Sequence, residues 1–361
     1  MKPQPRPGIM EVTAYVGGEA AIPGANRVIR LASNENPLGA SPRAVTAYTA
    51  LQEELHRYPD GSAKELRRTI AELHGLPEEQ LVCGAGSDEL IGLLVRAYAG
   101  PGDEVLHSAH GFLMYSIAAK TAGATPVAAP ETDLRADVDA LLAHVGERTR
   151  LLFLANPNNP TGSYLTSTEL RRLRDGLPEQ VLLVIDAAYA EYVEKADYEA
   201  GAALVEGGDN VIMTRTFSKI HGLAALRLGW AYGPPAVIDV LNRVRGPFNV
   251  SAPALAAGTA ALLDRSHVER SVAHNSRWLA WFCDEAKQLG LDPTQSVGNF
   301  ALLRFPGEPG RDAAAAAAHL KRNGILVRAM GAYGLPNCLR ITIGSEPEIR
   351  AVAEALTSFQ S

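Results

Sequence analysis

A lysine in an apolar context is the residue of this sequence best suited to covalent chemistry. Lys219 follows Ser218 and precedes an apolar helix start at Ile220. An amine that is shielded from water loses its proton more readily, and the neutral amine can attack a carbonyl carbon. The sequence therefore predicts that Lys219 forms a Schiff base.

Two further charged residues stand where an unpaired charge is costly. Asp186 ends the apolar run 181–185, where a buried carboxylate needs a cation such as the protonated ring nitrogen of a pyridine cofactor. Tyr189 is close enough in the chain to reach the phenolate oxygen of such a cofactor. Arg227 lies in the apolar stretch 223–230, where a phosphate would satisfy its guanidinium. The alternative for Asp186 is a helix-capping aspartate.

A glycine-rich turn at residues 84–87 precedes a predicted helix that begins near Asp88. Such a turn exposes backbone amides at the positive end of a helix, which suits a phosphate. Glu89 stands where a dinucleotide-binding fingerprint needs its third glycine, so that motif is excluded. A phosphate cradle and a plain strand-to-helix turn both remain open.

The elements that position these residues alternate between short apolar runs and amphipathic helical stretches. The predicted strands are 81–83, 105–107, 151–155, 181–185 and 211–214. This alternation favours a mostly parallel sheet that is covered by helices, and hence an α/β fold. Open parallel sheets bind ligands at the carboxyl ends of their strands, which is where the unusual polar residues fall.

The pattern changes beyond a long helix predicted at 266–289, on which we place a domain boundary. Strands at 299–305, 325–328 and 339–343 then alternate with helices that start at Asp312 and Pro347, which indicates a smaller α+β domain. We expect an N-terminal arm at 1–35 that packs with the small domain, a large cofactor-binding domain at 36–270 and the small domain at 271–361.

Composition limits the classes of function. The 361 residues are 47% hydrophobic and carry a formal net charge of −6, which gives no general reason to bind nucleic acid or an anionic membrane. The dispersed Cys83, Cys283 and Cys338 indicate reduced thiols, and no apolar run reaches membrane-spanning length, so we expect a cytoplasmic protein. The histidines show no metal-ligand pattern, and no metal is predicted.

With these residues in view, the chain strongly resembles the fold-type I aminotransferases that use pyridoxal 5'-phosphate, and within them the histidinol-phosphate aminotransferases. The resemblance covers nearly the whole chain. Its motifs lie at 34–37, 57–61, 84–89, 156–162, 186–191, 218–227 and 339–344.

The resemblance implies a role for each matching residue. Lys219 would hold the cofactor and move the proton, Asp186 would keep the pyridine nitrogen protonated, and Asn156 and Tyr189 would bind the ring oxygen. Phe112 would stack on the ring, where many relatives have tyrosine. The phosphate would be held by the Ser87 and Asp88 amides, the Thr216 and Ser218 hydroxyls, and Arg227.

The resemblance also implies a homodimer with shared active sites, because Tyr58 would reach the cofactor phosphate of the neighbouring subunit; a buried core tyrosine is the alternative. Tyr15, Asn156, Arg328 and Arg340 would contact the substrate. For Arg328 the alternative is a surface salt bridge.

The implied reaction transfers the amino group of L-glutamate to 3-(imidazol-4-yl)-2-oxopropyl phosphate, giving L-histidinol phosphate and 2-oxoglutarate in histidine biosynthesis. Three alternatives remain open: an aromatic amino-acid aminotransferase, a decarboxylase of a phosphorylated amino acid, and a cofactor-binding regulator. The regulator is disfavoured because no basic DNA-binding unit is apparent.

Overall fold

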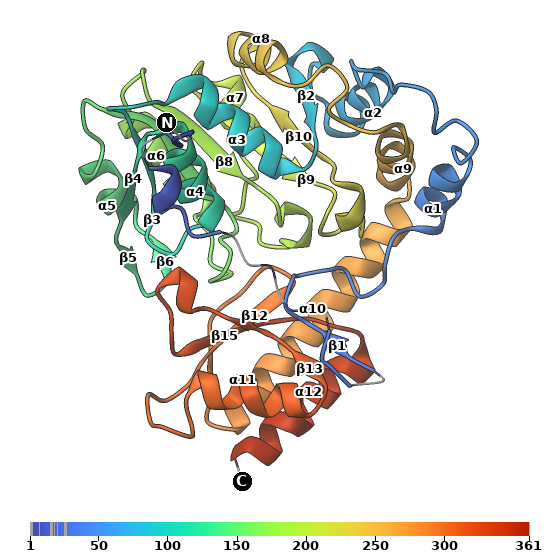
Figure 1. The fold of residues 1–361 in the computed structure, drawn as a ribbon, viewed down its shortest axis with the longest axis vertical. Helices are drawn as coiled ribbons and strands as arrows, with labels where there is room; N and C mark the ends of the chain where they lie inside the picture. Colours follow the sequence, from blue (N-terminus) through green and yellow to red (C-terminus); the bar gives the residue numbers. More distant parts are fainter. Residues whose placement is uncertain are drawn as a thin grey trace.

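The computed structural model describes residues 3–6, 8–14, 17, 19, 21–24 and 27–360. A seven-stranded sheet forms the larger part of the molecule (Figure 1). Its strands, in spatial order, are β2 (Leu81–Gly84), β10 (Gly229–Tyr232), β9 (Val211–Thr216), β8 (Leu182–Asp186), β7 (Thr149–Ala155), β3 (Glu104–Ser108) and β4 (Thr125–Ala129). Strand β10 pairs antiparallel with both β2 and β9, and the remaining pairs are parallel, so the prediction of a mostly parallel sheet is confirmed.

Helices cover both faces of this sheet, and alternate residues of each central strand point to opposite faces. On β8, Leu183 and Ile185 pack into one apolar core, whereas Leu182 and Val184 pack into the other. The first core is covered by α2 (Lys64–His74), α5 (Val138–Ala143), α6 (Ser167–Gly176), α7 (Ala202–Glu206) and α9 (Ala252–Leu262), with α1 (Pro42–Thr49) against α9. The second is covered by α3 (Ser87–Tyr98), α4 (Leu113–Ala122) and α8 (Pro235–Val244).

A second, smaller sheet lies beyond the long helix α10 (Arg265–Gln288), which runs from one part of the molecule to the other (Figure 1). Its strands, in order, are β11 (Asp292–Pro293), β12 (Phe300–Arg304), β15 (Cys338–Thr342) and β14 (Arg328–Ala329), and all pairs are antiparallel. Helices α11 (Ala313–Arg322) and α12 (Glu346–Gln360) share an apolar core with this sheet and α10. Asp312 caps α11 by accepting a hydrogen bond from the Ala315 amide.

The N-terminal segment joins the smaller part of the molecule. Strand β1 (Ile29–Arg30) pairs in parallel with β13 (Ile325–Leu326), and Leu31 packs into the core of α10, α11 and α12. The proposed domain bounds stay a prediction; the bound at residue 270 falls inside α10. A short hairpin, β5 (Glu131–Thr132) and β6 (Arg135–Ala136), completes the strands of the described residues.

Three elements differ from the pattern expected from the sequence. Strand β4 is an edge strand that contains Pro126 and is only partly buried, so its apolar signal is weak. Strand β10 has only four residues and begins at Gly229. The predicted strand 325–328 divides, because its first half pairs with β1 and its second half with β15. In the part of the chain that the structure describes, no helix is both long and apolar enough to cross a membrane.

The loop that carries Lys219 is fixed by a close backbone approach at Gly222. This residue has a φ of +66°, and a Cβ atom there would lie 2.2 Å from the carbonyl oxygen of Gly39. Only glycine meets both demands, because other residues are strained at this φ and the obstacle is backbone. Segment 36–40 and the Lys219 loop therefore hold each other in place.

Gly222→Ala is expected to destabilise the fold more than Gly75→Ala. Gly75 has a similar φ of +68°, but a Cβ there would meet nothing within 4 Å. Gly75→Ala should therefore cost only the strain of the left-handed conformation, about 1 kcal/mol. Gly222→Ala should add an overpacking cost of about 1–3 kcal/mol. Urea unfolding of both variants measures this difference, and equal losses would contradict the predicted contact.

Candidate active site

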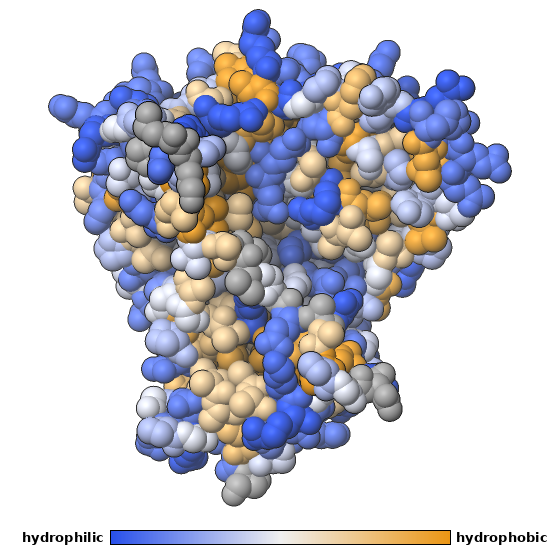
Figure 2. Space-filling model, viewed as in Figure 1, coloured by the Kyte–Doolittle hydropathy of each residue, from blue (hydrophilic) through white to orange (hydrophobic). Residues whose placement is uncertain are grey.

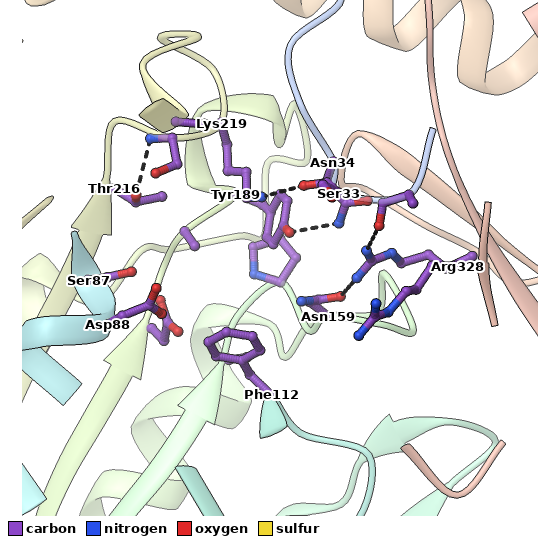
Figure 3. Close-up of a pocket in the computed structure, with 18 of the residues that line it drawn as sticks. Ser33, Asn34, Ser87, Asp88, Phe112, Asn159, Tyr189, Thr216, Lys219 and Arg328 are labelled. Carbon is purple, nitrogen blue, oxygen red and sulfur yellow. Dashed lines mark hydrogen bonds between the residues drawn. The ribbon is translucent and has the colours of Figure 1, made fainter. Parts of the chain in front are cut away.

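The carboxyl ends of β7, β8 and β9 and the turn after β2 open onto one pocket (Figure 3). The pocket also includes residues of the N-terminal segment and of the smaller sheet. Eleven of the residues predicted from the sequence line it: Ser87, Asp88, Phe112, Asp186, Tyr189, Thr216, Ser218, Lys219, Arg227, Arg328 and Arg340. The fold thus brings together predicted residues that are as distant in the sequence as Ser87 and Arg340.

Lys219 is a half-buried amine with a backbone acceptor. Its Nζ donates a hydrogen bond to the Ser33 carbonyl oxygen at 2.9 Å and lies 5.7 Å from the centre of the Tyr189 ring. Burial, followed by the positive charge of Arg340, lowers the pKa of Lys219 to about 8. A minor fraction of this amine is therefore neutral near physiological pH, far more than for an ordinary lysine, and the neutral form can act as a nucleophile or proton acceptor.

Asp186 is a buried carboxylate held by two hydroxyl groups. Tyr115 donates to its Oδ2 at 2.8 Å and Thr214 to its Oδ1 at 3.3 Å. Burial raises the pKa of Asp186 to about 6, although the hydrogen bond from Tyr115 opposes this shift; the negative charge of Asp88 contributes to it. The carboxylate is thus charged at neutral pH but needs further stabilisation by a proton donor or a cation.

The turn between β2 and α3 faces Arg227. Gly86 is the N-cap of α3, so no side chain covers the first amides of this helix. A Cβ atom at Gly86 would lie 2.5 Å from Nη2 of Arg227, and the φ of Gly86 is +85°. Helix dipole, backbone amides and a guanidinium therefore meet at one point, which is a suitable site for an anion.

Side chains around Arg227 complete this anion site. Its Nη2 donates to Asp88 at 3.1 Å and its Nη1 donates to the Ser218 hydroxyl at 3.1 Å. The Thr216 hydroxyl accepts a hydrogen bond from the Ser218 amide at 3.1 Å. Arg227 itself has a φ of +51°, a conformation that is unfavourable for a side-chain-bearing residue. The backbone of Arg227 is thus strained at the residue whose guanidinium faces the anion site.

Two aromatic residues border the middle of the pocket. Phe112 is the N-cap of α4 and meets the Tyr115 ring edge-on, with 5.8 Å between ring centres. The Tyr189 hydroxyl accepts a hydrogen bond from Asn34 Nδ2 at 2.8 Å, and its ring meets Phe300 edge-on at 5.3 Å. The Tyr189 ring is therefore held from two separate segments of the chain, whereas Phe112 contacts a residue of the helix that it caps.

Arg328 and Arg340 are direct cross-strand partners on β14 and β15. Arg340 is buried, and it donates to the Ala32 carbonyl oxygen at 2.7 Å and to the side-chain oxygen of Asn159. Its guanidinium carbon also lies 5.5 Å from the centre of the Phe300 ring. Two adjacent guanidinium groups at one pocket wall favour a ligand with a carboxylate or phosphate.

The prediction that Asn156 faces the ligand does not agree with this geometry. Its side-chain oxygen accepts from the Leu165 amide at 2.7 Å, and its side-chain nitrogen donates to the Leu165 carbonyl oxygen at 3.2 Å. The fully buried Asn156 side chain is thus engaged by the backbone of the loop that follows it. Asn159, three residues later in the same motif, lines the pocket instead.

One other predicted residue of the described part of the chain, Tyr58, does not line this pocket. Tyr58 is 83% exposed, so the alternative of a buried core tyrosine is wrong; its ring stacks on Phe248 with 4.7 Å between centres. Tyr15 lies outside the described residues. A role for either residue stays a prediction.

Sequence reasoning missed several residues that shape the site. Asn34 could have been noticed, because it begins one of the quoted motifs, and Tyr115 stands three residues after Phe112. Tyr333 also lines the pocket but lies in a short 3-10 turn without a chemical signal. Ala32 and Ser33 contribute carbonyl oxygens, for which no side chain gives a signal.

Comparison with known proteins agrees with this architecture. Residues 26–356 match the family "Aminotransferase class I and II". The chain is similar to the histidinol-phosphate aminotransferases of Paramagnetospirillum magneticum, with 60% identity over 99% of this chain and 98% of the relative, and of Rhodospirillum rubrum, with 57% identity over 99% and 97%.

Its fold is similar to the crystal structure of histidinol-phosphate aminotransferase from Sinorhizobium meliloti in complex with pyridoxal-5'-phosphate. The TM-score is 0.91 at 30% identity, and the match covers 98% of this chain and 97% of the other. The match over most of its length, together with the arrangement of the pocket, shows that this chain belongs to the class I and II aminotransferase family.

Proposed function

We propose that this protein is a histidinol-phosphate aminotransferase of histidine biosynthesis. It would transfer the amino group of L-glutamate to 3-(imidazol-4-yl)-2-oxopropyl phosphate, giving L-histidinol phosphate and 2-oxoglutarate in a reversible reaction. The observation that carries this proposal is the 60% identity to a relative of that name along 99% of the chain. The chemistry of the pocket supports it independently.

The pocket residues fit pyridoxal 5'-phosphate. The uncapped N-terminus of α3 and Arg227 provide donors for a phosphate, and Lys219 provides an amine for the cofactor's aldehyde. Among the residues that the structure describes, no cation pairs with the buried Asp186, so a protonated pyridine nitrogen would supply the missing charge. The anion site, the Lys219 amine and the Asp186 carboxylate therefore match the phosphate, the aldehyde and the ring nitrogen of this cofactor.

Each of these residues would hold a different part of the cofactor. The Ser87 and Asp88 amides, the Thr216 and Ser218 hydroxyls and Arg227 would hold the phosphate. Phe112 would pack on the ring, Asp186 would bind the ring nitrogen, and Tyr189 would bind the phenolate oxygen. Asn159, which lines the pocket, is a better candidate than Asn156 for a second contact to that oxygen.

When bound, pyridoxal 5'-phosphate supplies an electron-withdrawing ring that stabilises negative charge on the substrate carbon. Asp186 maintains that capacity by holding a proton at the ring nitrogen. Lys219 Nζ takes the proton from the substrate carbon that bears the amine and delivers it again later in the reaction. The lowered pKa of Lys219 suits this task, because a base with a pKa of about 8 can accept and release a proton near neutral pH.

Arg328 and Arg340 would bind the anionic end of both substrates. Glutamate presents carboxylates in one half-reaction and histidinol phosphate presents a phosphate in the other. Guanidinium groups bind both anions through paired hydrogen bonds, so one wall of the pocket can serve each in turn. Tyr15 would contribute to the same end of the site.

We further propose that the protein is a cytoplasmic homodimer with shared active sites. Apolar side chains are exposed just before α1, along α1, in the loop after it and next to both ends of α9: Leu38, Val45, Tyr48, Leu55, Tyr58, Phe248 and Leu263. Hydrophobic side chains lie among hydrophilic ones on this side of the molecule (Figure 2), and large exposed apolar groups are expected of a surface that another protein covers. A second copy would cover this surface, and Tyr58 would then approach the other copy's cofactor phosphate.

The assignment of cofactor and substrates is tested by the absorbance spectrum of the purified protein with pyridoxal 5'-phosphate. We expect a visible band that bleaches with glutamate and also with histidinol phosphate. Lys219→Ala should lose the band and nearly all transamination, whereas Lys219→Arg should retain bound cofactor without turnover. If only aromatic amino acids bleached the band, the substrate assignment would be wrong. If Lys219→Ala kept near-native activity, the role assigned to Lys219 would be wrong.

The rate at which the apoprotein captures pyridoxal 5'-phosphate is expected to rise with pH and to level off above a pH of about 8. The reason is that only the neutral amine attacks the aldehyde, and the pKa of Lys219 is lowered from its ordinary value to about 8 by burial and Arg340. Stopped-flow absorbance between pH 6 and pH 10 measures this rate. A rate that still climbed at pH 10 would mean that the amine has an ordinary pKa.

Leu55→Glu is expected to weaken the dimer at least about tenfold, because a carboxylate buried in an apolar interface costs more than about 1.4 kcal/mol. Leu55 is 70% exposed in the single chain, so the isolated subunit should tolerate the change. Gln288→Glu, which adds the same charge at the exposed end of α10, should leave association unchanged. Sedimentation velocity measures both, and a monomeric wild-type protein would refute the shared site.

A further inference from the structure

Tyr115 is a fully buried residue of α4 whose hydroxyl donates to Oδ2 of Asp186 at 2.8 Å. Its ring is fixed on two sides. It stacks on Phe153 of β7 with 4.7 Å between centres and an interplanar angle of 12°, and it meets Phe112 edge-on. The position of this hydroxyl is therefore set by packing on the sheet and on the pocket wall.

The alternation of side chains along β8 explains why the two groups meet. Val184 packs into the core beneath α3, α4 and α8, and Asp186, two residues later, points to the same face. Tyr115 and Phe153 belong to that same core. The carboxylate would therefore be surrounded by apolar groups on this side, were it not for the Tyr115 hydroxyl.

The charges around Asp186 make this donor necessary. Besides Tyr115 on α4, Asp88 at the start of α3 acts on the Asp186 carboxylate, and its negative charge favours the protonated form. The hydroxyls of Tyr189 and Tyr198 are engaged elsewhere, with Asn34 and with the Asn156 carbonyl oxygen. Thr214 of β9 is the second side-chain donor, at the longer distance of 3.3 Å.

We propose that Tyr115 is a positioning residue for the reaction: its hydroxyl keeps the buried Asp186 carboxylate ionised and fixes its orientation for the cofactor's ring nitrogen. This inference rests on the proposed function, since it assumes that pyridoxal 5'-phosphate occupies the pocket. Burial, together with the negative charge of Asp186, raises the pKa of Tyr115 well above its ordinary value, so the hydroxyl remains a donor. A donor that stays protonated favours the charged carboxylate at every working pH.

Tyr115→Phe tests the proposal, because it removes the hydroxyl and keeps the ring that stacks on Phe153. The matched control is Tyr164→Phe, whose hydroxyl donates to Asp197 at the same 2.8 Å but outside the pocket. The readout is the affinity of each apoprotein for pyridoxal 5'-phosphate, measured by absorbance titration between pH 5 and pH 8.

We expect Tyr115→Phe to weaken cofactor affinity about tenfold or more, because a hydrogen bond to a charged group contributes that much. The affinity should also begin to fall at a higher pH than in the wild type, since Asp186 would take up its proton sooner. Tyr164→Phe should match the wild type in affinity and pH profile. A Tyr115→Phe variant that did so too would overturn the proposal.

Asp186→Asn separates positioning from a merely structural role. In this background Tyr115→Phe should cause little further loss of affinity, because no charge remains to be stabilised. If Tyr115→Phe alone fails to fold, the double variant should fold, and a double variant that also unfolds would contradict the proposal. A wild-type apoprotein that binds no cofactor would refute the proposed function and this inference together, whereas normal wild-type binding with an unaffected Tyr115→Phe would refute only the inference.

Discussion

The arrangement of the pocket depends on a carboxylate that is almost withdrawn from water. Asp186 is 4% exposed at the end of a strand whose preceding residues are all buried. A carboxylate in such a place stays charged only if donors surround it. Strand β9 provides one side-chain donor through Thr214 and α4 provides another through Tyr115, so the packing of both elements is tied to the charge of one side chain.

Burial acts in opposite directions on the two ionisable groups at the centre of the pocket. It raises the pKa of Asp186 and lowers that of Lys219, so it favours the neutral form of each. Hydroxyl donors counteract this effect only at Asp186. The acceptor for Lys219 is a backbone carbonyl without net charge, and the nearby Arg340 strengthens the shift. At neutral pH one pocket can therefore keep an ionised acid together with an amine that loses its proton more readily than an ordinary lysine.

The fold and most of the pocket could be predicted because they rest on strong local signals. Continuous apolar runs mark buried parallel strands, and polar residues directly after such runs mark the ligand-binding edge. Prediction was weaker where the signal was short or ambiguous. The four-residue β10 and the half-exposed β4 were not predicted as strands. Which of the three asparagines within 156–159 faces the pocket could not be decided without the path of the loop. The cis peptide bonds before Pro157 and Pro160 are part of that path.

Segment 32–33 contributes to the pocket through its main chain. The Ala32 and Ser33 carbonyl oxygens accept hydrogen bonds from Arg340 and Lys219, while β1 just before them is paired with β13. Because every residue type carries the same carbonyl group, side chains at these two positions can diverge among homologues without loss of either contact. Alanine scanning would consequently undervalue this segment. Replacing the peptide bonds by esters, which weakens the acceptor oxygen, would expose its contribution.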